Sequence, residues 1–137
     1  MDGRTFIDTN VFIYAEDEDQ VDKRPVAREL IQQLAREERG VVSTQVLMEY
    51  VAAARRRLRL SLAQCRQSVL LMCRFEVVLI RPEQVLGALD LAGTYSLSHW
   101  DSLILKSAAA SGCRVLITED LQHGQTIEGV TVHNPFA

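Results

Sequence analysis

The sequence of 137 residues contains few cysteines, few prolines and no long hydrophobic run. Its three cysteines, Cys65, Cys73 and Cys113, form no CxxC pair, so a disulfide framework and a thiolate zinc site are both disfavoured. We expect buried, reduced thiols instead. No stretch approaches the ~20 apolar residues of a membrane span, and the first residues lack the basic and apolar parts of a signal peptide. We therefore expect a cytoplasmic protein without a membrane segment.

Motifs of several common enzyme classes are also missing. The chain has no GxGxxG sequence, no P-loop and no serine nucleophile elbow, so nothing in it favours dinucleotide binding, ATP hydrolysis or acyl transfer. The histidines, His99, His123 and His133, lack the spacing of metal ligands. We expect each of them on the surface or as a satisfied core residue.

The composition that remains is typical of one compact globular domain, which we expect to cover residues 1–137. Hydrophobic residues make up 47% of the chain and charged residues 24%, and the net charge is −3. Charge is unevenly distributed, because residues 50–81 contain seven arginines and a single acid, Glu76. A solvated helical face explains most such runs, and phosphate binding is the alternative.

Short apolar runs alternate with longer segments of helical character, a pattern that indicates an α/β fold with a parallel sheet. The runs are apolar throughout, so we expect helices on both faces of the sheet. The predicted strands are 5–8, 41–43, 77–80, 114–117 and 130–133. A short turn follows the first strand, and the predicted helices are 25–38, 45–58, 62–74, 83–95 and 99–111. Gly40 and Gly112 are expected to end helices in the left-handed conformation.

Acidic residues stand where two of the predicted strands end. Asp8 follows the first strand and Asp120 follows the fourth. Because ligand sites of parallel sheets lie at the carboxyl ends of the strands, both acids are candidates for one site. A helix cap or a turn explains each of them equally well when it is considered alone.

Two further acids lie in predicted helices. Glu49 is the only charge in residues 46–54, which are otherwise apolar around the whole helix and predict a buried segment. A buried carboxylate needs a cation, a hydrogen-bond partner or a cavity, and a salt bridge to a distant arginine is the structural alternative. Asp101 opens a helix three residues after Ser98, a spacing that also fits a capping box.

Convergence of these four carboxylates would need compensation. Two unit charges ~4 Å apart oppose each other by roughly 4 kcal/mol at an effective dielectric of 20. Protonation, a nearby Lys or Arg, or a divalent cation would relieve this repulsion, and oxygen ligands without His or Cys favour Mg²⁺ or Mn²⁺. Such an ion is suited to the hydrolysis of phosphodiesters.

With these acids in place, the chain resembles the PIN domain family, and within it the VapC-like ribonuclease toxins of type II toxin–antitoxin pairs. The resemblance runs through Glu49 and four short motifs: Phe6-Ile7-Asp8-Thr9-Asn10, Trp100-Asp101-Ser102-Leu103-Ile104, Thr118-Glu119-Asp120-Leu121-Gln122-His123-Gly124 and His133-Asn134-Pro135-Phe136. It implies a three-layer α/β/α sandwich with a parallel five-stranded sheet of order 3-2-1-4-5. The implied activity is that of a Mg²⁺- or Mn²⁺-dependent endoribonuclease.

The resemblance also assigns roles to individual residues. Asp8, Glu49, Asp101 and Asp120 would form a catalytic, metal-binding quartet. Two neighbours that orient the carboxylates by hydrogen bonds would be Asn10 and Thr118. Many relatives carry another acid at the position of Gln122, so we expect one firmly held cation here. The implied partners are an RNA substrate, a second copy of the chain in a homodimer, and a small antitoxin whose C-terminal segment blocks the site.

Other functions compete with this interpretation. Phosphatases of the haloacid dehalogenase type need an Asp where this chain has Asn10, and a response-regulator receiver needs one where it has Arg81-Pro82. The alternative from another class is a non-catalytic PIN-like module that binds RNA or protein through residues 50–81. The sequence identifies neither the RNA nor the antitoxin, and it assigns no role to Glu119 or His123.

Overall fold

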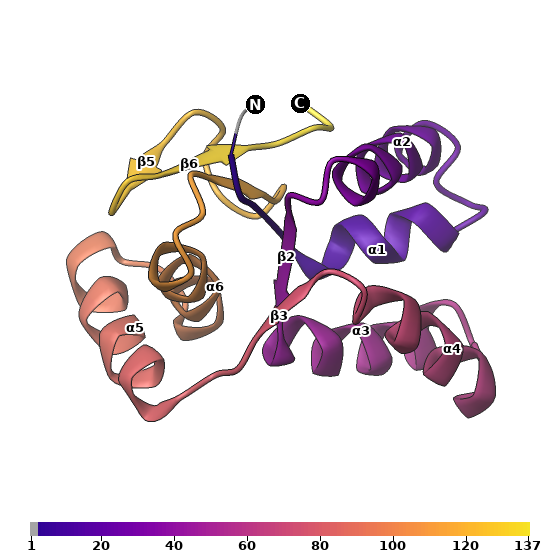
Figure 1. Cartoon of the computed structure of the whole chain (residues 1–137), viewed down its shortest axis with the longest axis horizontal. Coiled ribbons are helices and arrows are strands. Elements are labelled where there is room, and N and C mark those ends of the chain that lie inside the picture. Colours follow the sequence, from indigo (N-terminus) through magenta and orange to yellow (C-terminus); the bar gives the residue numbers. More distant parts are fainter. Residues whose placement is uncertain (1–2) are drawn as a thin grey trace.

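Strands form where β-branched and apolar residues cluster, and they assemble into one mixed sheet (Figure 1). The computed structural model describes residues 3–137. Its strands are β1 (Thr5–Ile7), β2 (Gly40–Ser43), β3 (Glu76–Val78), β4 (Val115–Ile117), β5 (Thr126–Ile127) and β6 (Val130–His133). They lie in the order β3-β2-β1-β4-β6-β5, and β1 therefore occupies the middle of the sheet.

The predicted α/β fold is confirmed, as is the order of the five predicted strands. All pairs from β3 to β6 are parallel, and Phe6 of β1 lies opposite Val41 of β2 and Leu116 of β4. The sixth strand, β5, was not predicted, and it pairs antiparallel with β6 at the edge of the sheet. It has only two residues, and its turn is made by Glu128 and Gly129, which both adopt positive φ as a tight hairpin requires.

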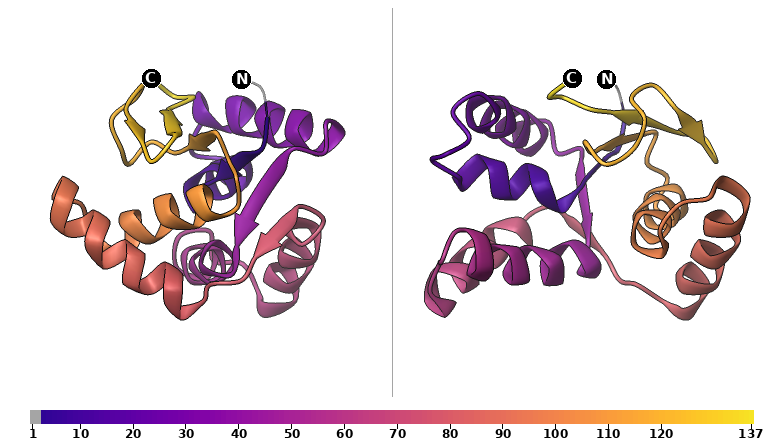
Figure 2. Two further views of the ribbon diagram at one scale, coloured as in Figure 1. Left: turned by 60° about the vertical axis from the view of Figure 1, so that its left-hand side comes forward. Right: turned by 180° about the vertical axis from the view of Figure 1, so that it is seen from behind.

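Helices cover both sides of the central strands (Figures 1 and 2). The helices are α1 (Thr9–Glu16), α2 (Lys23–Arg36), α3 (Thr44–Arg57), α4 (Leu62–Met72), α5 (Pro82–Tyr95) and α6 (His99–Ala110). The pair α5 and α6 pack against each other on one side, while α1, α2 and α4 lie on the other side. In the part of the chain that the structure describes, no helix is long and apolar enough to cross a membrane.

The segment after β1 is a full helix rather than the short turn that we predicted. Asp8 caps its N-terminus, and the side chains from Val11 to Tyr14 are all buried. Helix α1 packs against both α2 and α3, so its residues are apolar without a helical period. A continuous apolar run of this kind gives no periodic signal from which a helix could be predicted. This helix fixes the backbone immediately after the central strand.

Helix α3 is amphipathic, which corrects our prediction that residues 46–54 are buried all round. Val46, Tyr50 and Ala54 face the core, as their i, i+4, i+8 spacing requires. Met48 lies on the opposite face with 65% of its surface exposed. Because residues on this outer face are apolar too, the sequence contains no sign that the face is exposed.

The two glycines expected at helix ends behave differently. Gly112 follows α6 with φ +76°, as predicted. Gly40 is the first residue of β2 and does not adopt positive φ, so that prediction was wrong; Glu38 takes the left-handed conformation instead. Gly40 is required for space, because a Cβ atom there would lie 2.3 Å from the ring of Phe75. This glycine lets the ring close over the sheet edge.

The thiols also differ from one another. Cys65 and Cys113 are buried and free, as expected, whereas Cys73 is free but exposed at the end of α4. The prediction of burial was therefore wrong for one of the three. No function follows from an exposed thiol alone.

Replacing Gly40 with alanine should destabilise the fold by about 1–3 kcal/mol, because the new methyl group overlaps the Phe75 ring. The matched control is Gly93→Ala, which lies in α5 with no atom within 4 Å of its new Cβ and should be neutral or stabilising by about 1 kcal/mol. Urea unfolding measures both free energies. Combining Gly40→Ala with Phe75→Leu should recover part of the loss, and no recovery would contradict the steric explanation.

Candidate functional site

One cavity of about 310 Å³ opens where β1 and β4 end, and side chains from four separate segments line it. Asp8 follows β1, Glu49 lies in the middle of α3, Asp101 lies in the first turn of α6, and Asp120 follows β4. Asn10 lines the same cavity from α1. The structure therefore brings the four acids singled out in the sequence to the wall of a single cavity.

The Asp8 carboxylate is buried, and each of its oxygens accepts one hydrogen bond. One oxygen, Oδ1, accepts a hydrogen bond from the backbone N–H of Thr9 at 2.7 Å and thereby caps α1. The other, Oδ2, accepts from the Thr118 hydroxyl at 2.7 Å. Only 6% of the residue is exposed. The same carboxylate caps α1 and lines the cavity, so the interpretation of Asp8 as a helix cap and its interpretation as a site residue are compatible.

Thr118 and Asn10 connect the acids at the sheet end. The Thr118 hydroxyl donates to Asp8 and accepts a hydrogen bond from the backbone N–H of Asp120 at 3.1 Å. The Asn10 side-chain amide donates to Asp120 Oδ2 at 3.4 Å. Both residues thus make contacts of the kind that the family resemblance implies, and they hold the carboxylates with neutral donors.

The environment raises the pKa of two of these acids, Asp8 and Asp120. Burial raises the pKa of Asp8 from 3.8 to about 7, against the lowering effect of its hydrogen bonds with Thr118 and Thr9. The negative charges of Asp120 and Glu49 add to this rise. Asp120 is more exposed, yet the protein around its carboxyl group and then the charge of Asp101 raise its pKa as well.

Glu49 is held by neutral groups from two helices. Its Oε1 accepts a hydrogen bond from the Thr9 hydroxyl at 3.1 Å, and its Oε2 accepts one from the Gln45 amide at 3.5 Å. The same amide donates to the backbone carbonyl of Trp100 at 3.2 Å, which joins α3 to α6. The salt bridge considered as the structural alternative is not what holds Glu49. Gln45 lies one helical turn before Glu49, and that spacing was the available signal for it.

Asp101 is positioned by the start of α6. The Ser98 side chain accepts a hydrogen bond from the backbone N–H of Asp101 at 3.1 Å and caps the helix. The reciprocal half of the capping box, in which the Asp101 carboxylate would accept a hydrogen bond from the backbone N–H of Ser98, is not formed. The cap therefore orients the residue without engaging the carboxylate that lines the cavity.

Within residues 3–137, none of the four carboxylates forms an ion pair with a Lys or Arg. Those basic side chains that do form ion pairs have other acids as partners, among them Glu76, Glu119 and Glu128. One of the three remedies for repulsion, a neighbouring Lys or Arg in direct contact, is therefore not used. Protonation and a bound cation are the two that remain.

The rim of the cavity carries positive charge and apolar surface that we did not predict as part of the site. Arg56 and Arg57, from the end of α3, line the cavity together with Trp100 and Ile104 of α6. They are the only two of the seven arginines in residues 50–81 that line it. Arg56 follows Glu49 by seven residues, two helical turns, and this periodicity was the signal that would have linked them.

Glu119 faces away from the cavity although it adjoins Asp120. Its carboxylate accepts a hydrogen bond from the Lys23 ammonium group at 2.8 Å and another from the Tyr14 hydroxyl. These contacts lower the pKa of Glu119, opposing the effect of its partial burial. The segment after β4 is thereby fastened to α1 and α2, so Glu119 has a structural role beside the site.

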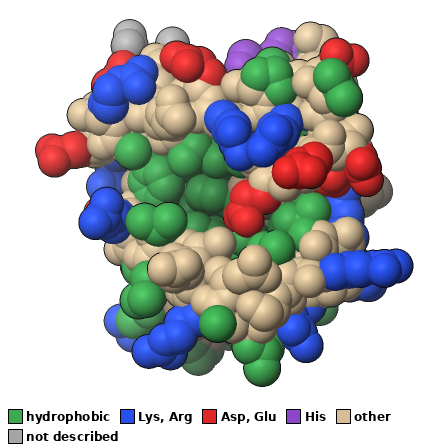
Figure 3. Space-filling model, turned by 90° about the vertical axis from the view of Figure 1, so that its right-hand side faces the viewer, with side chains coloured by type: hydrophobic (Ala, Val, Ile, Leu, Met, Phe, Trp, Pro, Cys, Tyr) green, Lys and Arg blue, Asp and Glu red, His purple; other side chains and the backbone are tan. Residues whose placement is uncertain are grey.

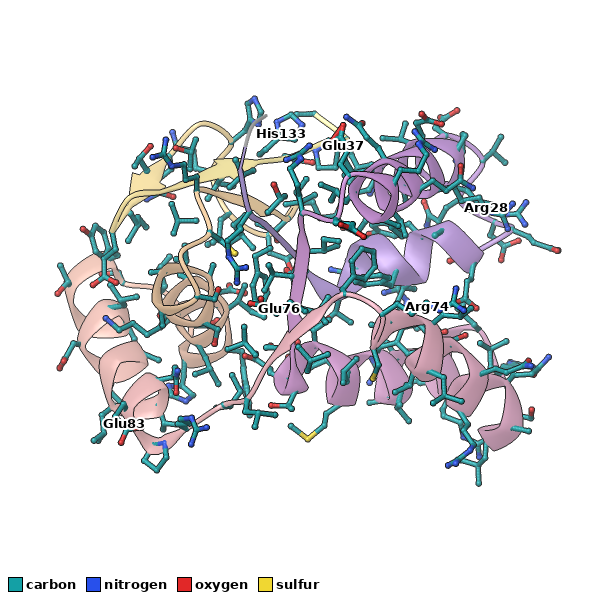
Figure 4. All side chains as sticks on the ribbon, viewed as in Figure 1. Arg28, Glu37, Arg74, Glu76, Glu83 and His133 are labelled. Atoms are coloured by element: carbon teal, nitrogen blue, oxygen red, sulfur yellow. The ribbon has the colours of Figure 1, made fainter. Side chains whose placement is uncertain are left out.

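The four acids line the cavity without being gathered. No three His, Cys, Asp or Glu side chains of the described residues 3–137 stand close enough together to hold a metal ion directly. His123 and His133 lie apart from the cavity; their rings are 5.3 Å apart, and His133 is at the edge of the molecule (Figure 4). Gln122 is exposed and does not line the cavity.

A second and larger hollow of about 860 Å³ lies between α1, α2 and α4. Hydrophobic side chains gather in a hollow on this side of the molecule, with charged groups around it (Figure 3). Phe12, Ile31 and Leu71 contribute apolar surface, and Arg28 and Arg74 lie on opposite sides of the opening (Figure 4). No acid of the candidate site lines this groove.

Solved structures share this fold across nearly the whole chain. A toxin–antitoxin complex from Klebsiella pneumoniae matches 96% of this chain and 97% of its own, with a TM-score of 0.70 and 21% identity. DNA-bound VapBC from Salmonella typhimurium matches 98% and 99%, with a TM-score of 0.66 and 20% identity. VapC20 from Mycobacterium tuberculosis, a toxin that cleaves the sarcin-ricin loop, matches 82% and 86%, with a TM-score of 0.61 and 13% identity.

Sequence comparison identifies the family. No curated protein sequence matches the chain. The sequence profile of the PIN domain matches residues 5–126, a range that contains all four acids together with β1 and β4. The chain therefore belongs to the PIN domain family.

Proposed function

We propose that the chain is a metal-dependent endoribonuclease that hydrolyses RNA phosphodiester bonds and acts as the toxin of a toxin–antitoxin pair. The observation that carries this proposal is the set of four carboxylates, none in an ion pair within residues 3–137, around one cavity of a PIN domain. The similarity in fold to a toxin that cleaves the sarcin-ricin loop supports it.

Mg²⁺ or Mn²⁺ fits the chemistry of these donors, which are all oxygens. Asp8, Asp101 and Asp120 would hold the ion directly or through water, and Glu49 would lie beside it. The spread of the four carboxylates suits an ion that keeps several of its own waters, since such an ion needs few direct ligands. When bound, it would neutralise charge on the phosphate and lower the pKa of the attacking water. With Gln122 outside the cavity, we propose a single firmly held ion.

The side chains of the protein would supply position and a base. Thr9 and Gln45 hold the Glu49 carboxylate by neutral donors, which leaves its negative charge available to orient or deprotonate the attacking water. Thr118 and Asn10 keep Asp8 and Asp120 facing the same cavity. The reaction adds water across the phosphodiester bond and releases a hydroxyl end and a phosphate end.

The substrate would be unpaired RNA. A cavity of about 310 Å³ has no room for a double helix, and unpaired bases can be splayed into such a space. Arg56 and Arg57 at the rim offer positive charge to the phosphates on either side of the cleaved bond.

One observation favours the alternative of a non-catalytic RNA-binding PIN module. The acids are not gathered into a ready metal site in the described residues 3–137, as an acidic surface with a structural role would also predict. Incubating RNA with the protein and Mg²⁺, with and without a chelator, separates the two. A binding module shifts the RNA without shortening it.

The apolar groove between α1, α2 and α4 supports an antitoxin partner. An amphipathic segment could cover its hydrophobic lining and pair with Arg28 and Arg74 at the opening. We also propose that the chain forms a homodimer. The side chains of Leu86 and Leu89 on α5 are exposed, and the apolar face that they form could be buried against a second copy of the chain.

Replacing Asp8 with Asn should stabilise the metal-free protein at pH 8 by about 2–4 kcal/mol, because the buried charge is removed and each pKa unit corresponds to about 1.4 kcal/mol. The folded protein binds this proton more tightly than the unfolded chain, so stability should fall as pH rises from 3.8 to about 7. Near pH 4 the variant should show little gain. Urea unfolding at both pH values measures this.

Mg²⁺ provides the second arm of the same experiment. It should raise the stability of the parent chain at pH 8 and have a much smaller effect on Asp8→Asn, since binding to the folded state stabilises by mass action. An Asp90→Asn control, at an exposed position of α5, should respond like the parent. Equal responses of the parent and Asp8→Asn to Mg²⁺ would remove Asp8 from the metal site.

Asp101→Asn should reduce RNA cleavage by about 10²-fold or more, since losing one charged ligand costs several kcal/mol of transition-state stabilisation. Its fold should be retained, because the helix cap uses the backbone of Asp101 and not its carboxylate. Cleavage of total cellular RNA is followed with Mg²⁺, with Mn²⁺ and with chelator. Asp90→Asn is the control, and chelator-resistant cleavage would contradict the proposal.

Leu71→Glu should disrupt binding of the antitoxin while leaving RNA cleavage by the free chain unchanged. Leu71 lines the apolar groove, so a buried charge there should weaken binding at least tenfold. Leu62→Glu is the matched control, because this leucine is also exposed on α4 but lies outside the groove. The assay is co-purification of the small protein encoded beside the chain, with light scattering of the free chain to report dimers. Equal retention by both variants would exclude the groove.

A further inference from the structure

Trp100 is the single tryptophan of the chain, and it is both exposed and part of the candidate site. Its side chain has 62% of its surface exposed, although it lies in the wall of the cavity beside Asp101. Large aromatic side chains gain free energy when they are buried, so an aromatic side chain left open in the wall of a candidate site has contact surface for a ligand. The helix cap at Ser98 does not supply one, because it engages the backbone only.

The backbone of Trp100 is fixed while its ring is left without a stacking partner. The Gln45 amide donates to its carbonyl at 3.2 Å, and this amide also contacts Glu49. Its one aromatic neighbour among the described residues is His99, whose ring lies 5.8 Å away at 66° to the indole. That edge-on arrangement leaves no parallel ring on the indole. The backbone of Trp100 is thus fixed beside Asp101 in α6, and the faces of its indole ring remain free to stack.

From this geometry we infer that Trp100 stacks against an unpaired nucleobase next to the cleaved phosphate and so selects single-stranded RNA at this site. The inference rests on the proposed function and names the feature of the substrate that the site recognises. The cavity offers the two kinds of surface that one nucleotide needs. Arg56 and Arg57 line it and would offer positive charge to the phosphates, and Trp100 with Ile104 provides an apolar wall for a base.

A protein contact is the competing use of an exposed tryptophan. Two observations favour a base. Trp100 lines the same small cavity as the four acids, where a folded partner has no room, and the groove suited to a peptide lies elsewhere, between α1, α2 and α4. Leu86 and Leu89, which support the proposed subunit contact, are on α5, and α5 does not line the cavity.

Binding is tested by the fluorescence of this one tryptophan. The protein used is a Glu49→Gln variant with Mg²⁺, which should bind RNA without cutting it. A randomised single-stranded RNA of about ten nucleotides should quench the fluorescence with saturation. An abasic oligomer with the same phosphates, and a duplex of the same length, should leave it nearly unchanged. Equal quenching by the abasic oligomer would overturn the inference.

Kinetics of the parent chain give an independent readout. Trp100→Ala should raise KM for single-stranded RNA by about 5- to 150-fold with kcat nearly unchanged, since base stacking is lost equally from the bound and transition states. Trp100→Phe should recover much of the affinity. Tyr95→Ala, which removes another exposed aromatic outside the cavity, should change neither constant.

The outcomes separate this inference from the proposed function. Quenching by single-stranded RNA without any cleavage by the parent chain would support the base contact and contradict the nuclease. Cleavage with unchanged KM in Trp100→Ala would leave the nuclease standing and overturn the base contact. A change in oligomeric state with unchanged RNA affinity would also overturn it, by making Trp100 a subunit contact.

Discussion

Repulsion between carboxylates is the constraint around which the carboxyl end of this sheet is built. Asp8 lies buried after the central strand, with the charges of Asp120 and Glu49 close enough to raise its pKa. Helix α1 makes this arrangement possible, because its first backbone amide and the Thr118 hydroxyl satisfy both oxygens of Asp8. Hydrogen bonds compensate for the lost water but not for the neighbouring charges. The fold therefore holds these acids in place at a cost in stability that a cation or a proton would relieve.

The hydrogen-bond donors around the acids are neutral, which explains why the repulsion between the carboxylates continues to lower the stability of the fold. Thr9, Thr118 and the amides of Asn10 and Gln45 orient three of the four carboxylates without adding positive charge. A network of this kind fixes direction while leaving the negative potential of the cavity intact. It also joins α1, α3 and the segment after β4, so the same contacts that set the site help to hold the layers together.

Much of this could be predicted from the sequence, because a charge within an apolar run is conspicuous whatever surrounds it. Asp8 and Glu49 interrupt such runs, and the strands that carry the sheet follow from β-branched clusters. The rest depends on packing between distant elements. That Arg56 and Trp100 border one cavity follows from how α3 meets α6, and the two-residue strand β5 exists only against β6. Gly40 was misassigned because its neighbour, Phe75, is far away in the sequence.

The contrast between Glu119 and Asp120 shows how the chain separates stability from function at adjacent positions. The Glu119 carboxylate accepts hydrogen bonds from Lys23 and Tyr14, and its role is structural. The Asp120 carboxylate accepts a hydrogen bond from a neutral donor, the Asn10 amide, and the backbone N–H of Asp120 donates to Thr118. A lysine placed against Asp120 instead would stabilise the metal-free fold, but it would compete for the very oxygens that a divalent ion would need. Among residues 3–137, ion pairs are formed outside the cavity, and the free energy that they would have contributed inside it is left for the ligand to supply.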